Sequence, residues 1–315
     1  MNNMPNNIKT NLLILFLCLF GSKVLYSQEV GGIVVNKFRH APLLLNMYNT
    51  TINGESVKSS VSAAYSVRRI NLFYSGPLMK IRRNSDNATL DVYYTANNGL
   101  DVTAITTFVG SNSAYVTTWY DQSGNGNNAV QNTFSAQPQI VKSGALVTEN
   151  GFPSIEFSGP DNAMNLVLNS KVTLTDGTLF GVTKVVNGSN TCGIAQSAAT
   201  GVSGVYSYNL NTWPNSTFIG ITSYGVIDAK STMKYNANLD VISWSKSSAN
   251  NYVEVNNRIA SSTVSLNVPI SIYKIYGNSV TGANLHVSEF IVTGYTTVPE
   301  KTVVFSNQQS YYGTP

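Results

Sequence analysis

Short stretches that alternate apolar and polar residues recur along the chain from about residue 115 onward, and clusters of Gly, Asn and Ser separate them. Runs of this kind, rich in β-branched and aromatic residues and bounded by turn residues, are typical of strands. The pattern predicts strands at 115–119, 136–141, 153–157, 178–186, 217–221, 240–245, 252–255, 271–275 and 286–292. Many short strands with turns between them favour an all-β sandwich or jelly roll.

The chain before residue 115 has a different pattern. Apolar positions between Ser60 and Phe73 permit one amphipathic helix, which the Ser-Gly-Pro at 75–77 would end. A second short helix is predicted at 101–108, with Asp101 as its N-cap. We also predict a short closing helix at 306–312.

The residues 254–258 are a candidate for a hairpin, and 287–292 is typical of a strand that faces the core. The segment Trp119-Tyr-Asp-Gln-Ser-Gly-Asn-Gly-Asn-Asn128 begins at a strand end and continues into Gly and Asn. We expect Asp121 to accept backbone N–H bonds there, as in an Asx-turn.

Residues 1–27 have the pattern of a secretory signal peptide, with Lys9 ahead of an apolar run from Asn11 to Phe20. That run is shorter than the roughly 20 residues that a membrane span needs. We therefore expect no membrane span, and a secreted, periplasmic or cell-surface location. Residues 28–315 are expected to form a single domain.

Charge and composition limit the classes of molecule that the protein is expected to bind. The chain has 19 basic and 15 acidic residues, and loss of a leader with Lys9 and Lys23 leaves a net charge of +2. No cluster of Lys or Arg exceeds the pairs at 68–69 and 82–83, so a nucleic-acid partner is not expected. Abundant Asn, Ser, Thr, Gly and Tyr are typical of a secreted protein that meets uncharged polar partners such as glycans.

The sequence gives no sign of a cofactor or a metal site. His40 and His286 lack Cys or carboxylate neighbours at metal-ligand spacing along the chain. No Gly-x-Ser-x-Gly elbow is present, and Gly124-Asn-Gly126 is a turn because no phosphate-loop Lys follows it. Cys192 is the sole cysteine after the leader, so no intramolecular disulfide is expected.

A set of sequence blocks then gives the chain a family resemblance. They are Ala64-Tyr-Ser-Val-Arg-Arg69, Tyr74-Ser-Gly-Pro-Leu78, Ile81-Arg-Arg-Asn-Ser-Asp86, Gly99-Leu-Asp101, Thr107-Phe-Val109 and Trp119 to Asn128. In this order and spacing they resemble the catalytic domain of the α-L-arabinofuranosidase B family of glycoside hydrolases. The resemblance is strong over about 60–131 and loose afterwards. It implies a concanavalin A-like, LamG-like jelly roll with one or two short N-terminal helices, acting on arabinofuranosyl-containing polysaccharide.

The resemblance also implies a retaining mechanism with two carboxyl groups, an acid/base and a nucleophile. The family's acid/base Asp falls on Asn278, in the run from Tyr276 to Ala283. An amide cannot deliver a proton, and losing such a donor typically forfeits a factor of about 10²–10⁴ in rate. Glu289 is the nearest carboxylate that could replace it. Its other interpretation is a solvent-facing or paired strand carboxylate.

The family's nucleophile falls on Tyr224, and an Asp two residues before it falls on Thr222. Asp228 is the one carboxylate close enough to replace the nucleophile. Its other interpretation is a turn residue in Gly225-Val-Ile-Asp-Ala229.

Some sugar contacts are expected to persist. Trp213 falls near the family's substrate-stacking Trp, where an indole would pack against a sugar face; a core or edge Trp is the alternative. Thr222, Gly277 and Asn278 complete the expected sugar-binding set. Cys192 falls where the family has a vicinal Cys–Cys pair, although a lone cysteine is usually a small buried hydrophobe.

Three functions fit these observations: an active α-L-arabinofuranosidase, a non-catalytic glycan-binding protein on the same fold, or a structural or adhesion module. Because both expected carboxylates are replaced, the sequence favours a secreted arabinofuranosidase-like sandwich that is inert or very weak as a hydrolase.

Overall fold

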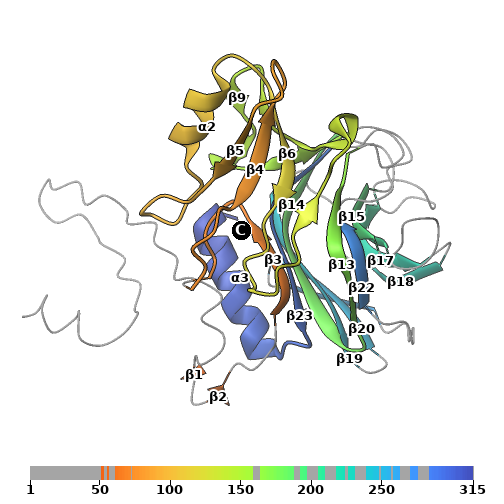
Figure 1. The fold of residues 1–315 in the computed structure, drawn as a ribbon. Helices are drawn as coiled ribbons and strands as arrows, with labels where there is room; N and C mark the ends of the chain where they lie inside the picture. The colour runs from red at the N-terminus through yellow and green to blue at the C-terminus, as the bar shows by residue number, and fades with distance from the viewer. Residues whose placement is uncertain are drawn as a thin grey trace, which may run out of the picture. The chain divides into compact units, whose positions relative to one another are not determined.

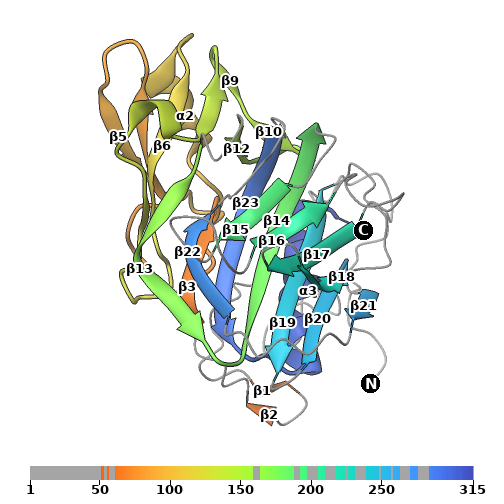
Figure 2. The same cartoon turned by 90° about the vertical axis from the view of Figure 1, so that its right-hand side faces the viewer.

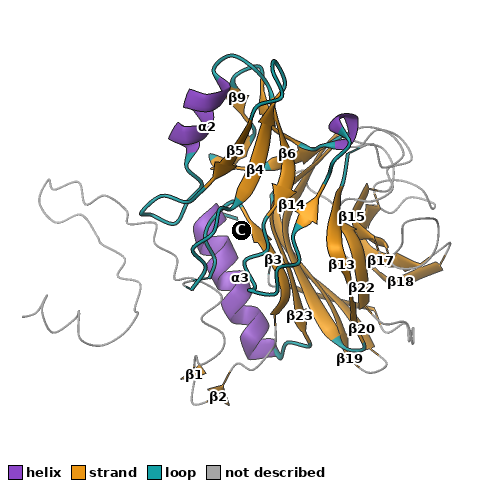
Figure 3. Ribbon diagram, in the orientation of Figure 1, coloured by secondary structure: helices purple, strands orange, loops and turns teal. Residues whose placement is uncertain are grey.

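Strands dominate the fold, as the alternating pattern predicts (Figures 1 and 3). The structure is a computed structural model, and it describes residues 51–52, 55–56, 61–71, 73–158, 164–187, 192–196, 205–209, 218–223, 226–230, 239–247, 250–256, 258–262, 270–275 and 284–314. These residues all belong to one compact unit, 40–315. The predicted signal peptide, 1–27, lies outside the described residues.

The elements, in chain order, are β1 (Thr51–Ile52), β2 (Glu55–Ser56), β3 (Val61–Ser66), β4 (Met79–Arg83), β5 (Thr89–Val92), α2 (Val102–Val109), β6 (Ala114–Trp119), β7 (Ala129–Val130), η2 (Phe134–Ala136), β8 (Gln139–Lys142), β9 (Ala145–Leu146), β10 (Thr148–Glu149), β11 (Phe152–Pro153), β12 (Ile155–Phe157), β13 (Leu166–Leu174), β14 (Gly177–Asn187), β15 (Cys192–Gln196), β16 (Val205–Asn209), β17 (Phe218–Ser223), β18 (Val226–Lys230), β19 (Asp240–Ser247), β20 (Asn250–Val255), β21 (Arg258–Ser262), β22 (Ile270–Ile275), β23 (Asn284–Gly294) and α3 (Val298–Tyr312).

Two layers of antiparallel strands form a sandwich. One layer runs in the order β3, β23, β14, β19, β20 and β21, and the other in the order β13, β22, β15, β16, β17 and β18. Figures 1 and 2 show α3 on the outer side of the first layer and the second layer on its other side. The fold is therefore the all-β sandwich that the sequence predicts.

The strand β23, second in the first layer, is buried along almost its whole length. Residues 285–293 are all buried, which includes the apolar Val287, Phe290 and Val292. The strand is flanked by β14 on one side and by β3 and β12 on the other. The prediction of a core-facing strand at 287–292 is therefore confirmed, although both faces of the strand are buried.

The strands β5, β4, β6 and β8 are neighbours in a further antiparallel region, which follows β3 in the chain. The helix α2 lies between β5 and β6 in the chain, and the Asp101 side chain accepts a hydrogen bond from the Ala104 N–H at 2.9 Å. This cap satisfies one of the unpaired N–H groups at a helix start, so the prediction of a helix capped by Asp101 is confirmed.

The helix predicted between Ser60 and Phe73 is wrong, because residues 61–66 form β3. Val61, Ala63, Tyr65 and Val67 also alternate with period two, and all four are buried. These residues form a strand because they pair with β23, where Tyr65 lies opposite Phe290. Tertiary contact therefore overrides a pattern that local spacing leaves ambiguous.

The closing helix is real and longer than predicted. It begins at Val298, where Thr297 and Glu300 form a capping box and Pro299 stands in the first turn. It ends at Gly313, whose φ of 63° is left-handed and suits glycine. In the described part of the chain, neither helix has the length and apolar character to cross a membrane.

The candidate site and the buried carboxylates

Four of the eight residues of the sequence-predicted site lie outside the described residues: Trp213, Tyr224, Gly277 and Asn278. Backbone positions are described for Cys192 on β15, Thr222 on β17 and Asp228 on β18. Asp228 lies at a bulge, since Ile221 pairs with Ala229 while Thr222 pairs with Ile227. Bulges commonly re-aim side chains beside active sites. The fold thus brings the backbones of Thr222 and Asp228 together, one strand apart.

Cys192 belongs to the same run of strands but to a different row. It pairs with Tyr208 on β16, which pairs in turn with Ile219 on β17. That row crosses β17 three residues before Thr222. The predicted positions on β15 and β17 therefore share one layer of the sandwich.

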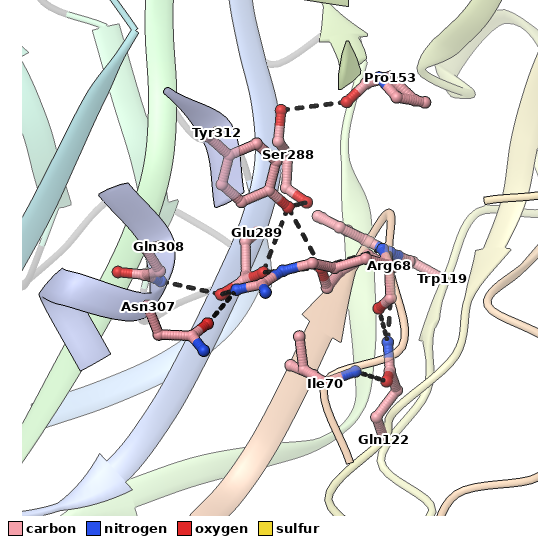
Figure 4. A network of polar contacts seen from close by, with 11 residues as sticks. Arg68, Ile70, Trp119, Gln122, Pro153, Ser288, Glu289, Asn307, Gln308 and Tyr312 are labelled. Atoms are coloured by element: carbon pink, nitrogen blue, oxygen red, sulfur yellow. Dashed lines mark hydrogen bonds and ion pairs between the residues drawn. The ribbon is translucent and has the colours of Figure 1, made fainter. Parts of the chain in front are cut away.

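Glu289 belongs to the other layer, on β23, and it forms a buried ion pair with Arg68 (Figure 4). Its Oε2 lies 2.9 Å from the Arg68 Nε, and the two side chains are 0% and 1% exposed. Burial, the largest single influence, would lower the pKa of Arg68, but the charge and hydrogen bond of Glu289 together with Tyr312 and Tyr311 outweigh it and raise that pKa. Arg68 therefore stays charged opposite the carboxylate.

Further hydrogen bonds occupy both oxygens of this carboxylate. Oε2 accepts from the Ser66 Oγ at 2.8 Å and from the Tyr312 hydroxyl at 3.2 Å, and Oε1 accepts from the Gln308 Nε2 at 3.0 Å. Arg68 also donates to the Asn307 Oδ1 at 2.7 Å. We call Ser66, Arg68, Glu289, Asn307, Gln308 and Tyr312 the buried polar layer. Of the two interpretations of Glu289, the geometry matches a paired strand carboxylate.

Side chains of the segment Trp119 to Asn128 hydrogen-bond to the backbone that carries this layer. The Trp119 Nε1 donates to the Ser66 carbonyl at 3.2 Å, and the Gln122 side chain donates to the Arg68 carbonyl at 2.9 Å (Figure 4). Gln122 also accepts from the Ile70 N–H at 2.9 Å. The most recognisable motif of the chain therefore holds the backbone that carries Arg68.

Asp121, inside the same motif, is a structural carboxylate. It accepts backbone N–H bonds from Ala64 at 2.8 Å, Ser123 at 2.9 Å and Asn127 at 3.0 Å. Its side chain also accepts from the Ser123 hydroxyl at 2.7 Å, and the residue is 3% exposed. The predicted role as acceptor in a turn is confirmed, and it extends to β3.

A second cluster joins carboxylates that are distant in sequence. His286 on β23 has its Nδ1 2.7 Å from the Glu149 Oε1 and its Nε2 3.0 Å from the Glu156 Oε2. A neutral imidazole has one N–H donor, so only the imidazolium can donate to both carboxylates. The chain spacing around His286 did not reveal these neighbours, because they come from β10 and β12.

Two lysines complete this cluster. The Lys184 Nζ lies 2.7 Å from Glu149 and the Lys142 Nζ lies 2.6 Å from Glu156. Burial would raise the pKa of Glu156, but hydrogen bonds from His286 and Lys142 outweigh it and lower that pKa. A retaining glycosidase leaves the space between its two carboxyl groups free for a sugar. Here the imidazole fills it, so this pair is a structural ion cluster.

Asp240, at the start of β19, differs from the other carboxylates. Burial raises its pKa to about 6, against the lowering effect of a hydrogen bond from the Asn256 Nδ2 at 3.0 Å. A carboxyl group that holds a proton near neutral pH has the chemistry of a general acid. Its side chain is only 2% exposed, however, so a substrate cannot reach it. Burial of the carboxylate form therefore lowers the stability of the protein.

Comparison with known proteins agrees with the fold. The family model described as "Alpha-L-arabinofuranosidase B, catalytic" matches residues 54–258. The probable α-L-arabinofuranosidase B of Aspergillus clavatus is 32% identical over 123 residues, which is 39% of this chain and 21% of that relative. The corresponding protein of Aspergillus fumigatus gives the same identity and coverage. The chain thus matches about a fifth of the length of these relatives.

Among solved structures, an arabinofuranosidase complexed with arabinofuranosyl-α-1,2-xylobiose superposes with a TM-score of 0.58 and 18% sequence identity. The superposition covers 81% of this chain and 63% of that one. At such low identity the likeness concerns the fold.

Proposed function

The chain belongs to the family of α-L-arabinofuranosidase B catalytic domains, and from that premise we propose that it binds arabinofuranosyl-containing glycans with little or no hydrolysis. The alignment behind this proposal puts Asn278 at the acid/base position and Tyr224 at the nucleophile position. An amide at Asn278 cannot deliver a proton, and arabinofuranose lacks the carboxylate that would favour a tyrosine nucleophile like that of sialidases.

The observation that carries the proposal is the state of Glu289. This residue is the carboxylate nearest in sequence to Asn278, and it would be the natural replacement for the missing acid/base. It is buried, paired with Arg68 and bonded on both oxygens. A group so placed cannot approach a glycosidic oxygen. Asp228 then remains the candidate for any residual activity.

The glycan that we propose carries arabinofuranose on a xylose main chain. The support is the structural neighbour that holds arabinofuranosyl-α-1,2-xylobiose, a ligand of that class. We further propose that residues 1–27 direct export, which would place the protein where such plant-type polysaccharides occur.

The test is hydrolysis of 4-nitrophenyl α-L-arabinofuranoside by the protein, with the melting temperature measured in parallel with and without arabinose. We expect thermal protection without turnover. Turnover would refute the inert site and point to Asp228. Absence of both signals would refute glycan binding and leave a structural or adhesion module.

A restoration experiment tests the assigned positions. The double variant Asn278→Asp/Tyr224→Glu restores both carboxyl groups, so it should gain hydrolysis of the same substrate. Each single variant should gain nothing, because a retaining site needs both groups. A double variant that folds, binds arabinose and stays inert would show that the two positions are assigned wrongly.

The proposed sugar platform has its own test. Replacing Trp213 by Ala should weaken arabinoside binding by about 1–3 kcal/mol, the scale of burying one large side chain. Calorimetric titration would measure this loss. An unchanged affinity would remove Trp213 from the site.

A further inference from the structure

A group of aromatic side chains that the site above does not use lies in the segment before β4 and directly after β5 and β6. They are Phe73, Tyr74, Tyr93, Tyr94 and Tyr120, and we call them the tyrosine face. The three tyrosines Tyr74, Tyr93 and Tyr120 lie within electrostatic reach of one another. Tyr94 joins them through a hydrogen bond from its hydroxyl to the Tyr74 carbonyl at 3.2 Å.

The family-like block Tyr74 to Leu78 shapes one side of this face. The Tyr74 hydroxyl donates to the Pro77 carbonyl at 2.6 Å, so the ring folds back over its own loop. A Cβ at Gly76 would lie 2.7 Å from that hydroxyl, which explains the glycine. The loop thus fixes the Tyr74 ring, and Phe73 precedes it with its side chain outward.

Two side chains of this face are exposed to solvent, whereas Tyr74 and Tyr94 pack partly against the core. Phe73 is 83% exposed and Tyr93 is 51% exposed. A single exposed apolar residue needs no explanation, but neighbouring exposed rings commonly mark an interaction site. Hydrogen bonds from their hydroxyl groups hold the Tyr74 and Tyr94 rings, so these two rings would lose little freedom on binding.

The charged groups at this face have partners within the chain. Lys80 on β4 pairs across the sheet with Asp91 on β5, and their charged groups are 3.7 Å apart. The Tyr120 hydroxyl donates to the same Asp91 carboxylate at 2.7 Å. The Arg69 guanidinium lies over the Tyr94 ring, 4.6 Å from its centroid.

Such a surface fits an uncharged partner that has both apolar faces and hydroxyl groups. A nucleic acid or an acidic peptide would need unpaired cations, and the cations here are already engaged with Asp91 and Tyr94. Partial burial and the hydrogen bond to Asp91 raise the pKa of Tyr120, and partial burial raises the pKa of Tyr74 to about 12. Both hydroxyls therefore stay neutral at physiological pH.

We propose that the tyrosine face binds the main chain of a neutral polysaccharide, with pyranose rings packed against Tyr93 and Phe73. Sugar hydroxyls would meet the Asp91 carboxylate and the tyrosine hydroxyls. The choice of a xylose main chain rests on the proposed function, whereas the face itself does not. This second contact holds a polymer to the domain independently of its arabinose side groups.

The experiment is electrophoresis of the full chain through gels that contain soluble arabinoxylan or unsubstituted xylan. We expect retardation in both gels. The variant Tyr93→Ala should raise the apparent Kd about tenfold, which is about 1.4 kcal/mol, and Phe73→Ala/Tyr93→Ala should raise it further. The control is Tyr295→Ala, which removes a partly exposed tyrosine between β23 and α3 and should bind like the parent.

Three results would overturn the proposal: no retardation of the parent protein, equal retardation of parent and double variant, or an equal loss in the control. Sedimentation of the same variants covers one further case. A dimer that the double variant abolishes, without glycan binding, would assign the face to a second copy of the chain.

The two proposals fail separately. Arabinose protection of the melting temperature reports the arabinose site and should be unchanged in Phe73→Ala/Tyr93→Ala. If arabinose does not protect the parent protein while xylan still retards it in a way that depends on Tyr93, the proposed function is refuted. The proposal for the tyrosine face is then still supported.

Discussion

Two consecutive arginines, Arg68 and Arg69, lie over tyrosine rings in regions of opposite character. The Arg68 guanidinium is 4.3 Å from the Tyr311 ring centroid inside the buried polar layer, and the Arg69 guanidinium is 4.6 Å from the Tyr94 centroid at the tyrosine face. Arg68 is 1% exposed, whereas Arg69 is partly exposed. The same pair of residue types therefore lies inside the fold in one region and at a partly exposed surface in the other.

Desolvation sets the difference between these regions. In the buried layer each charge has lost its water and depends on its partners, so removal of one partner leaves an uncompensated charge. At the tyrosine face water replaces any lost contact, and cation–π contacts at such sites contribute only about 0.5–1 kcal/mol. Mutations should therefore reduce stability in the first region and affinity in the second.

The largest effect is expected for Arg68→Met, which leaves the Glu289 carboxylate buried without its counter-charge. We expect the free energy of unfolding to fall by about 3–5 kcal/mol, as measured by urea denaturation. The double variant Arg68→Met/Glu289→Gln removes both charges and should lose less than the single variant. A loss below about 1 kcal/mol in Arg68→Met would mean that water reaches the layer.

The next largest effect is expected for Asp121→Ala. This change orphans the buried N–H groups of Ala64, Ser123 and Asn127, so about 3 kcal/mol or more should be lost, at about 1–3 kcal/mol for each unsatisfied group. Asp101→Ala is the matched control, because it orphans a single N–H and should cost about 1 kcal/mol. Equal losses in the two variants would contradict the account of this turn.

Asp240→Asn should stabilise the protein at neutral pH. The raised pKa of about 6 means that the folded chain keeps a proton that the unfolded chain releases near pH 4. Stability from this group is therefore present below about pH 4 and is lost as the pH rises through about 6. Two pKa units correspond to about 2–3 kcal/mol at pH 7.

The control for Asp240→Asn is the same comparison at pH 4, where the two proteins should unfold alike. Thermal melts at both pH values measure the difference. A variant that gains nothing at pH 7 would show that the carboxylate is solvated there.

The smallest effect on stability is expected for Tyr93→Ala, because the ring is half exposed. Its free energy of unfolding should change by about 0.5 kcal/mol or less. A loss as large as that of Arg68→Met would mean that the tyrosine face is part of the core. The contrast between the two regions would then disappear.

Local chemistry made part of this fold predictable. The Asp101 cap, the Asp121 turn and the strand at 287–292 each follow from residues that are close in sequence. The start of α3 was also readable, since Thr297 and Glu300 have the spacing of a capping box next to Pro299. The sequence therefore contains the information needed to place the start of α3 at Val298, eight residues before the predicted start.

Long-range contacts could not be predicted in the same way. The partner of Glu289 is Arg68, more than two hundred residues earlier, and the carboxylates beside His286 come from two other strands. β3 was misassigned because its pairing with β23 decides its structure. The sequence identifies Glu289 as the carboxylate nearest to Asn278. Only the pairing of β3 with β23 shows that its charge is neutralised by Arg68.

Glu289→Gln tests the central claim most directly, when unfolding and hydrolysis of 4-nitrophenyl α-L-arabinofuranoside are measured on the same preparations as the parent protein. A structural carboxylate predicts a loss of about 3–5 kcal/mol in the free energy of unfolding, with turnover no different from that of the parent. A variant that keeps its stability and loses turnover would show that Glu289 is catalytic and would contradict the account.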